Sequence, residues 1–284
     1  KRGLADFTAA VLRSGGTKSK SRDQWGEELE NIAASVESGM GETSASVSFS
    51  GLKESTPAVL AAFKEFLTEP EFRQDRLDLA ITQARSGIAR RNDDADGIPD
   101  RELASILYGR DNPYGWQLEY EHLNNIKRED LIAFYQRYYF PKNIILSVYG
   151  DFDAASMRTQ LETLLGGWKV ERPAVPAFPA VTAKPSAGVY LGEKADVTQT
   201  FFALGHLGGT YKDPDYPALQ VAANILGQGF SSRLVSEVRT KLGYAYNIAA
   251  VWSPDFDHQG TFRIVGSTKS ASTVETVEAI RKEL

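Results

Sequence analysis

The chain has 284 residues, of which 42% are hydrophobic and 24% are charged, and it carries a formal net charge of −5 at pH 7. These values are typical of a globular protein with room for two domains. No apolar run approaches the roughly 18 residues of a membrane-spanning helix, and the basic residues do not gather in one segment. Neither a membrane span nor a nucleic-acid partner is therefore expected. The absence of cysteine excludes disulfides, thiolate metal sites and a cysteine nucleophile.

The first half of the chain carries mostly helical patterns. Apolar residues at helical spacing predict helices over residues 4–12, 21–36, 56–66, 72–91, 99–107 and 154–165, and from residue 128 onward. The alternation of Ala45, Val47 and Phe49 with serines predicts a half-buried strand. The apolar run over 143–149 (NIILSVY) predicts a second strand, which we expect to be buried.

A proline-rich tract divides the chain. Four prolines between residues 166 and 187 predict an extended linker. Beyond it, the patterns predict strands over 188–191, 198–205, 246–252 and 261–265, and helices over 216–226, 231–242 and from about 272.

The two sides of this linker present their elements in a similar order. Each has an apolar helix, a glycine break (Gly15-Gly16 or Gly227-Gln228-Gly229), a second helix, strand material and a further helix. The fold class predicted is therefore α+β, with two homologous domains over 1–165 and 188–284. Each is expected to be an antiparallel-rich sheet with helices packed on one face. Because the chain opens without a Met or a signal peptide and stops within a helical pattern, we expect both natural ends to lie outside this sequence.

Histidines and acidic residues predict no metal site. His122, His206 and His258 lie far apart, and none has a second histidine four residues away on a helix. We expect His122 at the surface, His206 packed at a strand end and His258 in a polar turn. The acidic run over 92–96 lacks the ligand spacing of a calcium loop.

Serine chemistry is not indicated either. The chain has no G-x-S-x-G elbow, and the G-x-G at Gly227–Gly229 is weak evidence for a nucleotide site. Ser231, as the residue that caps the next helix, explains this stretch without a ligand.

The segment 3–17, GLADFTAAVLRSGGT, resembles the helix on which insulinase/pitrilysin-type zinc peptidases carry an inverted H-x-x-E-H motif. In that motif two histidines bind zinc and the glutamate acts as general base. By this resemblance the first His falls on Asp6, the Glu on Ala9 and the second His on Ala10. The stretch most similar to the family's third ligand, residues 84–90, contains no acid. The ligands and the base are thus absent together, and we expect no metal in this chain.

The same resemblance extends over nearly the whole chain. It rests on the order of several short landmarks, among them Ser50-Gly51-Leu52, Asn112-Pro113-Tyr114-Gly115, 138–143 (YYFPKN) and 229–234 (GFSSRL). In the second half, Arg239 and Tyr246 match a pair that the family uses to hold the substrate backbone and stabilise the tetrahedral intermediate. A guanidinium and a phenol suit those roles. From the residues alone, Arg239 is equally a cation at a helix C-terminus and Tyr246 an ordinary strand aromatic.

The resemblance implies a function in a complex. In two-chain members such as mitochondrial processing peptidase and bacterial heterodimeric peptidases, one subunit brings zinc and the other brings the Arg/Tyr pair. We therefore expect a non-catalytic subunit, inactive alone, with a homologous zinc-bearing partner and an extended peptide substrate. The bacterial analogy favours the periplasm over the cytoplasm. Three alternatives stay open: a structural scaffold, a peptide-binding module without a catalytic partner, and an enzyme that uses an unrelated site near Asp93–Asp96.

Overall fold

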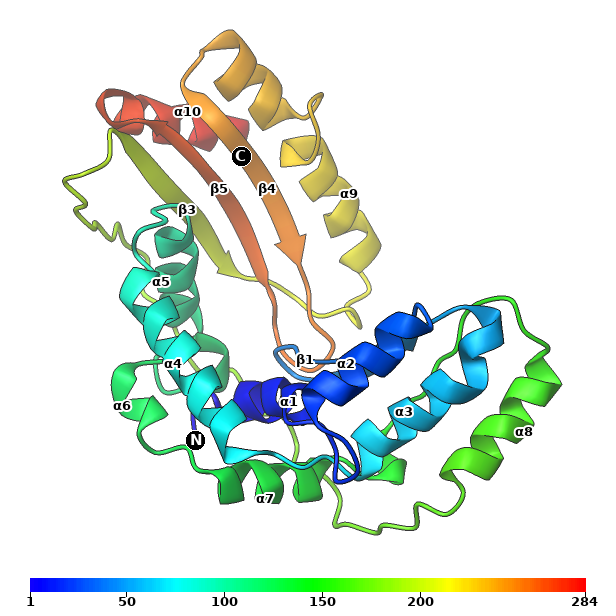
Figure 1. The fold of residues 1–284 in the computed structure, drawn as a ribbon. Coiled ribbons are helices and arrows are strands. Elements are labelled where there is room, and N and C mark those ends of the chain that lie inside the picture. The colour runs from blue at the N-terminus through cyan, green and yellow to red at the C-terminus, as the bar shows by residue number, and fades with distance from the viewer. The chain divides into compact units, whose positions relative to one another are not determined.

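A computed structural model describes all 284 residues, and its contacts divide the chain into two compact units (Figure 1). Unit 1 comprises residues 1–88 and 118–176, and unit 2 comprises residues 89–117 and 177–284. The chain crosses from unit 1 to unit 2 at residue 176, which lies within the predicted linker. Residues 89–117 were assigned from the sequence to the first domain, but their contacts group them with the second half of the chain.

Unit 1 is mainly helical and contains a single two-stranded sheet. Its helices and strands are α1 (Leu4–Ser14), α2 (Arg22–Asn31), β1 (Ser35–Met40), β2 (Ala45–Ser50), α3 (Thr56–Thr68), most of α4 (Gln74–Arg90), α6 (Tyr120–Leu123), α7 (Arg128–Tyr138) and α8 (Ala154–Leu165), with short 3-10 turns at Lys53–Ser55 and Pro141–Asn143. α1 packs against both β1 and α7, and α3 packs against the hairpin. Phe7, Leu12, Phe66, Leu77 and Leu131 belong to the buried core that these elements enclose.

Unit 2 is built on a three-stranded antiparallel sheet of order β3-β5-β4. Its elements are α5 (Gly97–Tyr108), β3 (Gln199–Leu207), α9 (Tyr216–Gly227), the π-helical segment η4 (Val235–Lys241), β4 (Ala245–Ser253), β5 (Thr261–Lys269) and α10 (Thr273–Glu283), with 3-10 turns at Pro113–Gly115 and Ser270–Ser272. Residues of η4 and α10 form one core with Ile248, Ala250 and Ile264 of the sheet. In Figure 1, α9 runs beside β4, and the two elements are in contact.

The segment α5 covers the other face of this sheet. Leu204 pairs with Ile264 and packs on the core, so the neighbouring pair, Gly205 and Arg263, points to the opposite face. There the Arg263 guanidinium lies 3.1 Å from the Asp100 carboxylate of α5. A Cβ on Gly205 would come within 3.1 Å of the Leu103 side chain. The predicted class of helices packed on antiparallel sheet is confirmed, and α5 adds a helix from the first half of the chain.

Most predicted elements are confirmed, but the helix predicted over 21–36 ends at Asn31. Its start is well defined, because Ser21 and Gln24 form a reciprocal capping box. Ala33 then takes a left-handed φ of 50°, and the chain turns into β1, which pairs with β2. Val36 is fully buried in that strand. Apolar spacing alone could not separate the end of the helix from the start of the strand.

The strands predicted over 143–149 and 188–191 are wrong. Neither segment is paired, and the side chains of Ile145, Tyr149 and Leu191 are 96%, 103% and 93% exposed. Both segments have strand-forming side chains, but a strand also needs a neighbour for its backbone groups, and each sheet is limited to the pairings described above. The helix predicted over 231–242 begins at Arg233, after Ser232, so Ser231 is not its cap.

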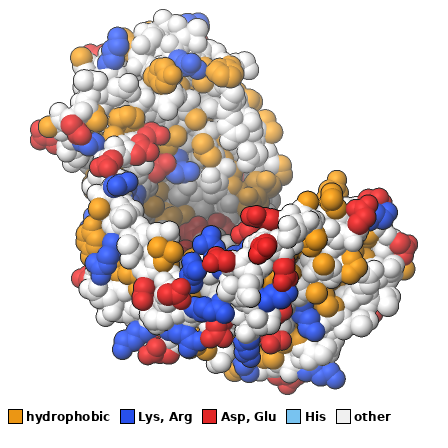
Figure 2. Space-filling view, viewed as in Figure 1, with side chains coloured by type: hydrophobic (Ala, Val, Ile, Leu, Met, Phe, Trp, Pro, Cys, Tyr) orange, Lys and Arg blue, Asp and Glu red, His pale blue; other side chains and the backbone are white.

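No helix has the length and apolar character needed to cross a membrane. On the face drawn in Figure 2, Lys and Arg side chains lie among Asp and Glu side chains.

A matched pair of leucine variants tests this burial pattern within unit 2. Leu234→Ala removes a fully buried side chain and is expected to lower the free energy of unfolding by about 2–5 kcal/mol. Leu191→Ala removes a nearly fully exposed side chain and is expected to change it by less than about 0.5 kcal/mol. Urea denaturation followed by circular dichroism measures both. A large loss for Leu191→Ala would place 188–191 in a packed strand.

Candidate functional site

The helix that resembles the zinc-motif helix is α1, in unit 1. Asp6 and Ala10 lie four residues apart on its exposed side, whereas Ala9 is 2% exposed and belongs to the packed side. The Ser38 hydroxyl of β1 donates a hydrogen bond to the Ala9 carbonyl at 2.5 Å. This hydrogen bond joins α1 to the hairpin at the position that the resemblance assigns to the general base.

These residues do not fit a zinc ion. Asp6 offers one carboxylate, and the two alanines offer no ligand atom. Desolvation raises the pKa of the Asp6 carboxyl above its usual value, and a backbone hydrogen bond offsets part of this rise. Residues 84–90, the counterpart of the third-ligand stretch, lie in α4, where the Arg85 guanidinium donates to the Asn124 side chain at 2.6 Å.

Arg239 lies in the irregular segment η4 of unit 2. This segment is π-helical over seven residues, a conformation that is rare and often found at functional sites. The Arg239 side chain is exposed and makes no hydrogen bond or ion pair; its guanidinium carbon lies 5.7 Å from the centroid of the Phe230 ring. The next cation, Lys241, is instead paired with Glu237. Arg239 is in the last turn of η4, so the helix-terminus interpretation also stays open.

Tyr246 lies at an irregularity of β4. Ala245 pairs with Thr268 and Asn247 with Ser267, so Tyr246 is the extra residue of a β-bulge. Bulges re-aim side chains and recur next to active sites. Tyr246 is 77% exposed, and its ring packs on no other aromatic ring. Its exposure is compatible with a site residue and with an ordinary aromatic on the outer face of a strand.

Two buried threonines stabilise the turn between Arg239 and Tyr246 through hydrogen bonds. The Thr268 hydroxyl of β5 donates to the Tyr244 carbonyl at 2.6 Å and lies 2.9 Å from the Thr276 hydroxyl of α10. Thr268 and Thr276 are 2% and 0% exposed. Gly243 completes the turn with a left-handed φ of 64°. Arg239 in η4 and Tyr246 in β4 therefore lie on either side of this turn, and no hydrogen bond joins them.

Phe230 is a residue that the sequence analysis did not single out. It is 85% exposed and lies under the Arg239 guanidinium. Together with Leu242, which is 48% exposed, it adds apolar area to this surface. Its only sequence indication was its place in the landmark 229–234.

The three histidines have structural environments. His122 is half-buried, and its Nδ1 accepts a hydrogen bond from the Glu119 amide at 2.9 Å, which closes a helix cap. His206 is exposed in β3. His258 is buried, contrary to the polar turn predicted for it: its ring stacks on Tyr114 at 3.6 Å, and its Nδ1 lies 3.3 Å from the Asp257 carboxylate. The aromatic neighbours of His258 come from residues 108–114. These residues are distant in sequence, so the pattern of the turn alone could not predict the burial.

A family model described as the peptidase M16 inactive domain matches residues 125–284, more than half of the chain. The chain belongs to this family. The predicted kinship with insulinase-type zinc peptidases is thereby confirmed, and the chain is a homologue of the inactive M16 domain.

Known relatives of this M16 chain are longer than it is. It is 25% identical over 277 residues to an "uncharacterized zinc protease" of Rickettsia bellii, covering 94% of this chain and 63% of that protein. It is also 25% identical over 255 residues to the "non-peptidase homolog YmxG" of Helicobacter pylori, covering 87% of this chain and 56% of that protein. The chain therefore spans about three fifths of these relatives.

A solved structure shares the fold. The crystal structure of a peptidase M16 inactive domain from Pseudomonas fluorescens superposes with a TM-score of 0.89 at 25% identity, covering 99% of this chain and 68% of that one.

Zinc titration tests the degenerate motif. We expect the parent chain to bind well under one zinc per chain, because α1 supplies one carboxylate and no imidazole. The double variant Asp6→His, Ala10→His places two imidazoles on one exposed helix face and is expected to gain measurable zinc binding. Equilibrium dialysis with metal analysis measures both, and Asp6→His alone is the control. A full equivalent of tightly bound zinc in the parent chain would contradict the placement of the motif.

Proposed function

We propose that this M16 chain is the non-catalytic subunit of a heterodimeric zinc peptidase. It binds an extended peptide and supplies Arg239 and Tyr246 to a zinc site on a homologous partner that carries H-x-x-E-H. Alone it hydrolyses nothing, and it needs no metal of its own. A bacterial periplasm is proposed as its compartment ahead of the cytoplasm, by analogy with bacterial heterodimeric peptidases.

The observation that carries the proposal is the contrast between the two motifs. The ligand positions on α1 are occupied by residues that cannot bind zinc, and Ala9 has become part of a packed core. Arg239 and Tyr246, by comparison, are both exposed, and neither makes a hydrogen bond or ion pair. Both side chains stand on irregular backbone, a π-helical segment and a β-bulge, of the kind that recurs at functional sites. They are suited to binding a peptide carbonyl and a developing oxyanion.

The free edge of the unit 2 sheet is a second argument for peptide binding. β4, which carries Tyr246, is an outer strand. An outer strand has unpaired backbone groups that can accept an extended peptide. Gly227 at the end of α9 lies against Ala250, so the accessible part of β4 is its first half, where Tyr246 lies. Exposed Phe230 and Leu242 would contact apolar side chains of such a peptide.

Kinetics of the reconstituted complex test this role. The chain is co-purified with an H-x-x-E-H homologue from the same genome, and hydrolysis of a fluorogenic peptide is measured. Arg239→Ala and Tyr246→Phe are each expected to lower kcat/KM by about a hundredfold, because each removes a donor to the transition state. Size-exclusion chromatography is expected to find the complex intact.

Two exposed residues outside this surface serve as matched controls. Lys241→Ala removes a nearby cation that is paired with Glu237, and Tyr149→Phe removes another exposed phenol; both should leave turnover unchanged. Unchanged turnover in Arg239→Ala and Tyr246→Phe would favour the scaffold. Hydrolysis by the isolated chain that survives a chelator would favour an unrelated site such as Asp93–Asp96.

A further inference from the structure

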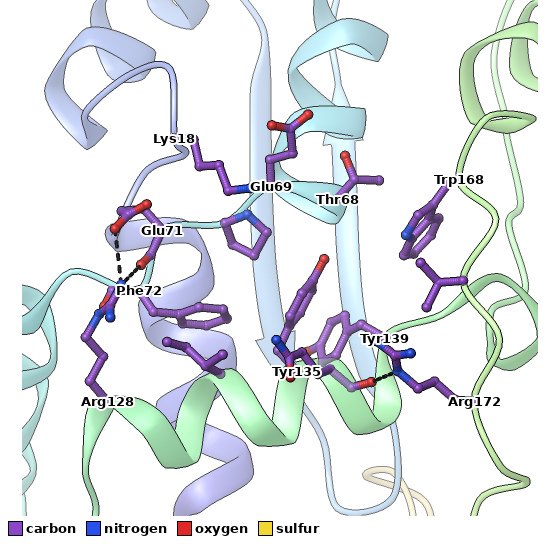
Figure 3. A pocket seen from close by; sticks show the side chains of 14 residues that line it. Lys18, Thr68, Glu69, Glu71, Phe72, Arg128, Tyr135, Tyr139, Trp168 and Arg172 are labelled. Atoms are coloured by element: carbon purple, nitrogen blue, oxygen red, sulfur yellow. Dashed lines mark hydrogen bonds and ion pairs between the residues drawn. The ribbon is translucent and has the colours of Figure 1, made fainter.

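The polar side chains that line the pocket of unit 1 do not converge on one ligand group. This pocket has a volume of about 350 Å³ and lies between the loop after α1, the C-terminal end of α3 and one side of α7 (Figure 3). Lys18 and Glu69 lie on the opposite side of it from Arg172. The Tyr139 hydroxyl is enclosed by protein atoms. In unit 2, by contrast, the candidate residue Arg239 has a direct neighbour.

This neighbour is the aromatic ring of Phe230. The guanidinium carbon of Arg239 lies over the ring, 5.7 Å from its centroid, which is within the range of a cation–π interaction. Arg239 makes no hydrogen bond or ion pair, and the carboxylate of the same segment, Glu237, is paired with Lys241 instead. The ring is therefore the group with which the Arg239 cation interacts.

The loop that carries Phe230 is held in place at its base. The Gly229 carbonyl accepts hydrogen bonds from the Ser232 amide at 3.2 Å and from the Ser232 hydroxyl at 2.7 Å. Ser232 is buried, and Gly229 takes a left-handed φ of 90°, which favours glycine. The next residue, Arg233, forms an ion pair with Glu283 of α10 at 3.0 Å. The backbone of this loop is thus fixed to unit 2, and the Phe230 ring extends from it.

Packing does not account for a phenylalanine at this position. Phe230 is largely exposed and contacts no other aromatic ring, so it adds little to the buried apolar area that stabilises the fold. The interaction with the Arg239 guanidinium is the one defined contact of its ring.

This contact restrains the guanidinium without using its hydrogen-bond donors. At 5.7 Å the ring acts on the cation as a whole, so the N–H groups of Arg239 stay available to a ligand. An exposed arginine samples many rotamers, and this freedom is lost when a ligand binds. A ring that limits the rotamers in advance therefore strengthens the binding of a carbonyl or an oxyanion to the same N–H groups.

We propose that Phe230 is the positioning residue for Arg239. It holds the guanidinium on this surface through a cation–π interaction, so that the N–H donors meet a peptide carbonyl or the developing oxyanion. The inference rests on the proposed function of Arg239. It goes beyond that function because it assigns to Phe230 an effect that acts through another side chain.

Nuclear magnetic resonance of the chain alone tests the contact without a peptidase partner. The Nε–Hε signal of Arg239 is identified by its loss in Arg239→Lys. Phe230→Leu removes the ring current and is expected to shift this signal. Phe178→Leu, at another exposed phenylalanine of unit 2, is expected to leave it in place. An unchanged signal in Phe230→Leu, or an equal change in Phe178→Leu, overturns the inference.

Kinetics of the complex with the H-x-x-E-H homologue test the consequence. Phe230→Leu keeps an apolar side chain without a ring and is expected to lower kcat/KM about two- to fivefold, the size of an exposed cation–π interaction. Phe230→Tyr keeps the ring and is expected to retain turnover. In the Arg239→Ala background, Phe230→Leu is expected to cause no further loss, because no cation remains for the ring to hold. Phe178→Leu is again the control and should leave turnover unchanged.

The outcomes separate this inference from the proposed function. If Arg239→Ala lowers kcat/KM but Phe230→Leu does not, the inference is overturned and the proposed function stands. The same holds if Phe230→Tyr loses as much as Phe230→Leu, or if Phe230→Leu causes an equal loss in the Arg239→Ala background. If Arg239→Ala leaves kcat/KM unchanged, the proposed function fails and the inference fails with it. Circular dichroism confirms that each variant is folded.

Discussion

The hydroxyl of Thr268 connects the elements on which the candidate surface of unit 2 depends. It bonds to the carbonyl of Tyr244 at the turn between η4 and β4 and lies against Thr276 of α10. Both threonines are buried, so these bonds are made where water cannot replace them. β5, which carries Thr268, is also the central strand and sets the register of β3 and β4. One side chain thus links the sheet, the terminal helix and the turn that presents Arg239 and Tyr246.

The proposed motif positions on α1 and the proposed pair Arg239 and Tyr246 have opposite relations to packing. On α1, Ala9, the position that the resemblance assigns to the general base, is buried and accepts a hydrogen bond from Ser38 of β1. A glutamate at Ala9 would bring a charge to this buried position. On unit 2, Arg239 and Tyr246 contribute little to any core. Ala9 thus contributes to the packing of unit 1, whereas Arg239 and Tyr246 contribute little to the stability of unit 2.

The sequence predicted most helices, because their apolar spacing and caps are local properties. Pro57 at the start of α3 and the capping box of Ser21 are examples. The strands over 143–149 and 188–191 failed for a non-local reason, since their side chains favour a strand but no neighbouring strand pairs with them. The candidate pair Arg239 and Tyr246 followed from the family resemblance alone. The burial of His258 depends on Tyr108 and Tyr114, which are distant in sequence, so no local pattern contains it.

The connectivity of the two units has a consequence for the order of biosynthesis. The chain passes between the units at residues 88, 117 and 176, so each unit is assembled from two separate stretches. α5, which ends at Tyr108, leaves the ribosome well before β3, which begins at Gln199 and supplies the face that α5 covers. Until β5 and its partners have been translated, Leu103 and its neighbours have no sheet to pack against. The sheet that α5 covers is therefore completed only after β5 has been translated, long after α5 itself.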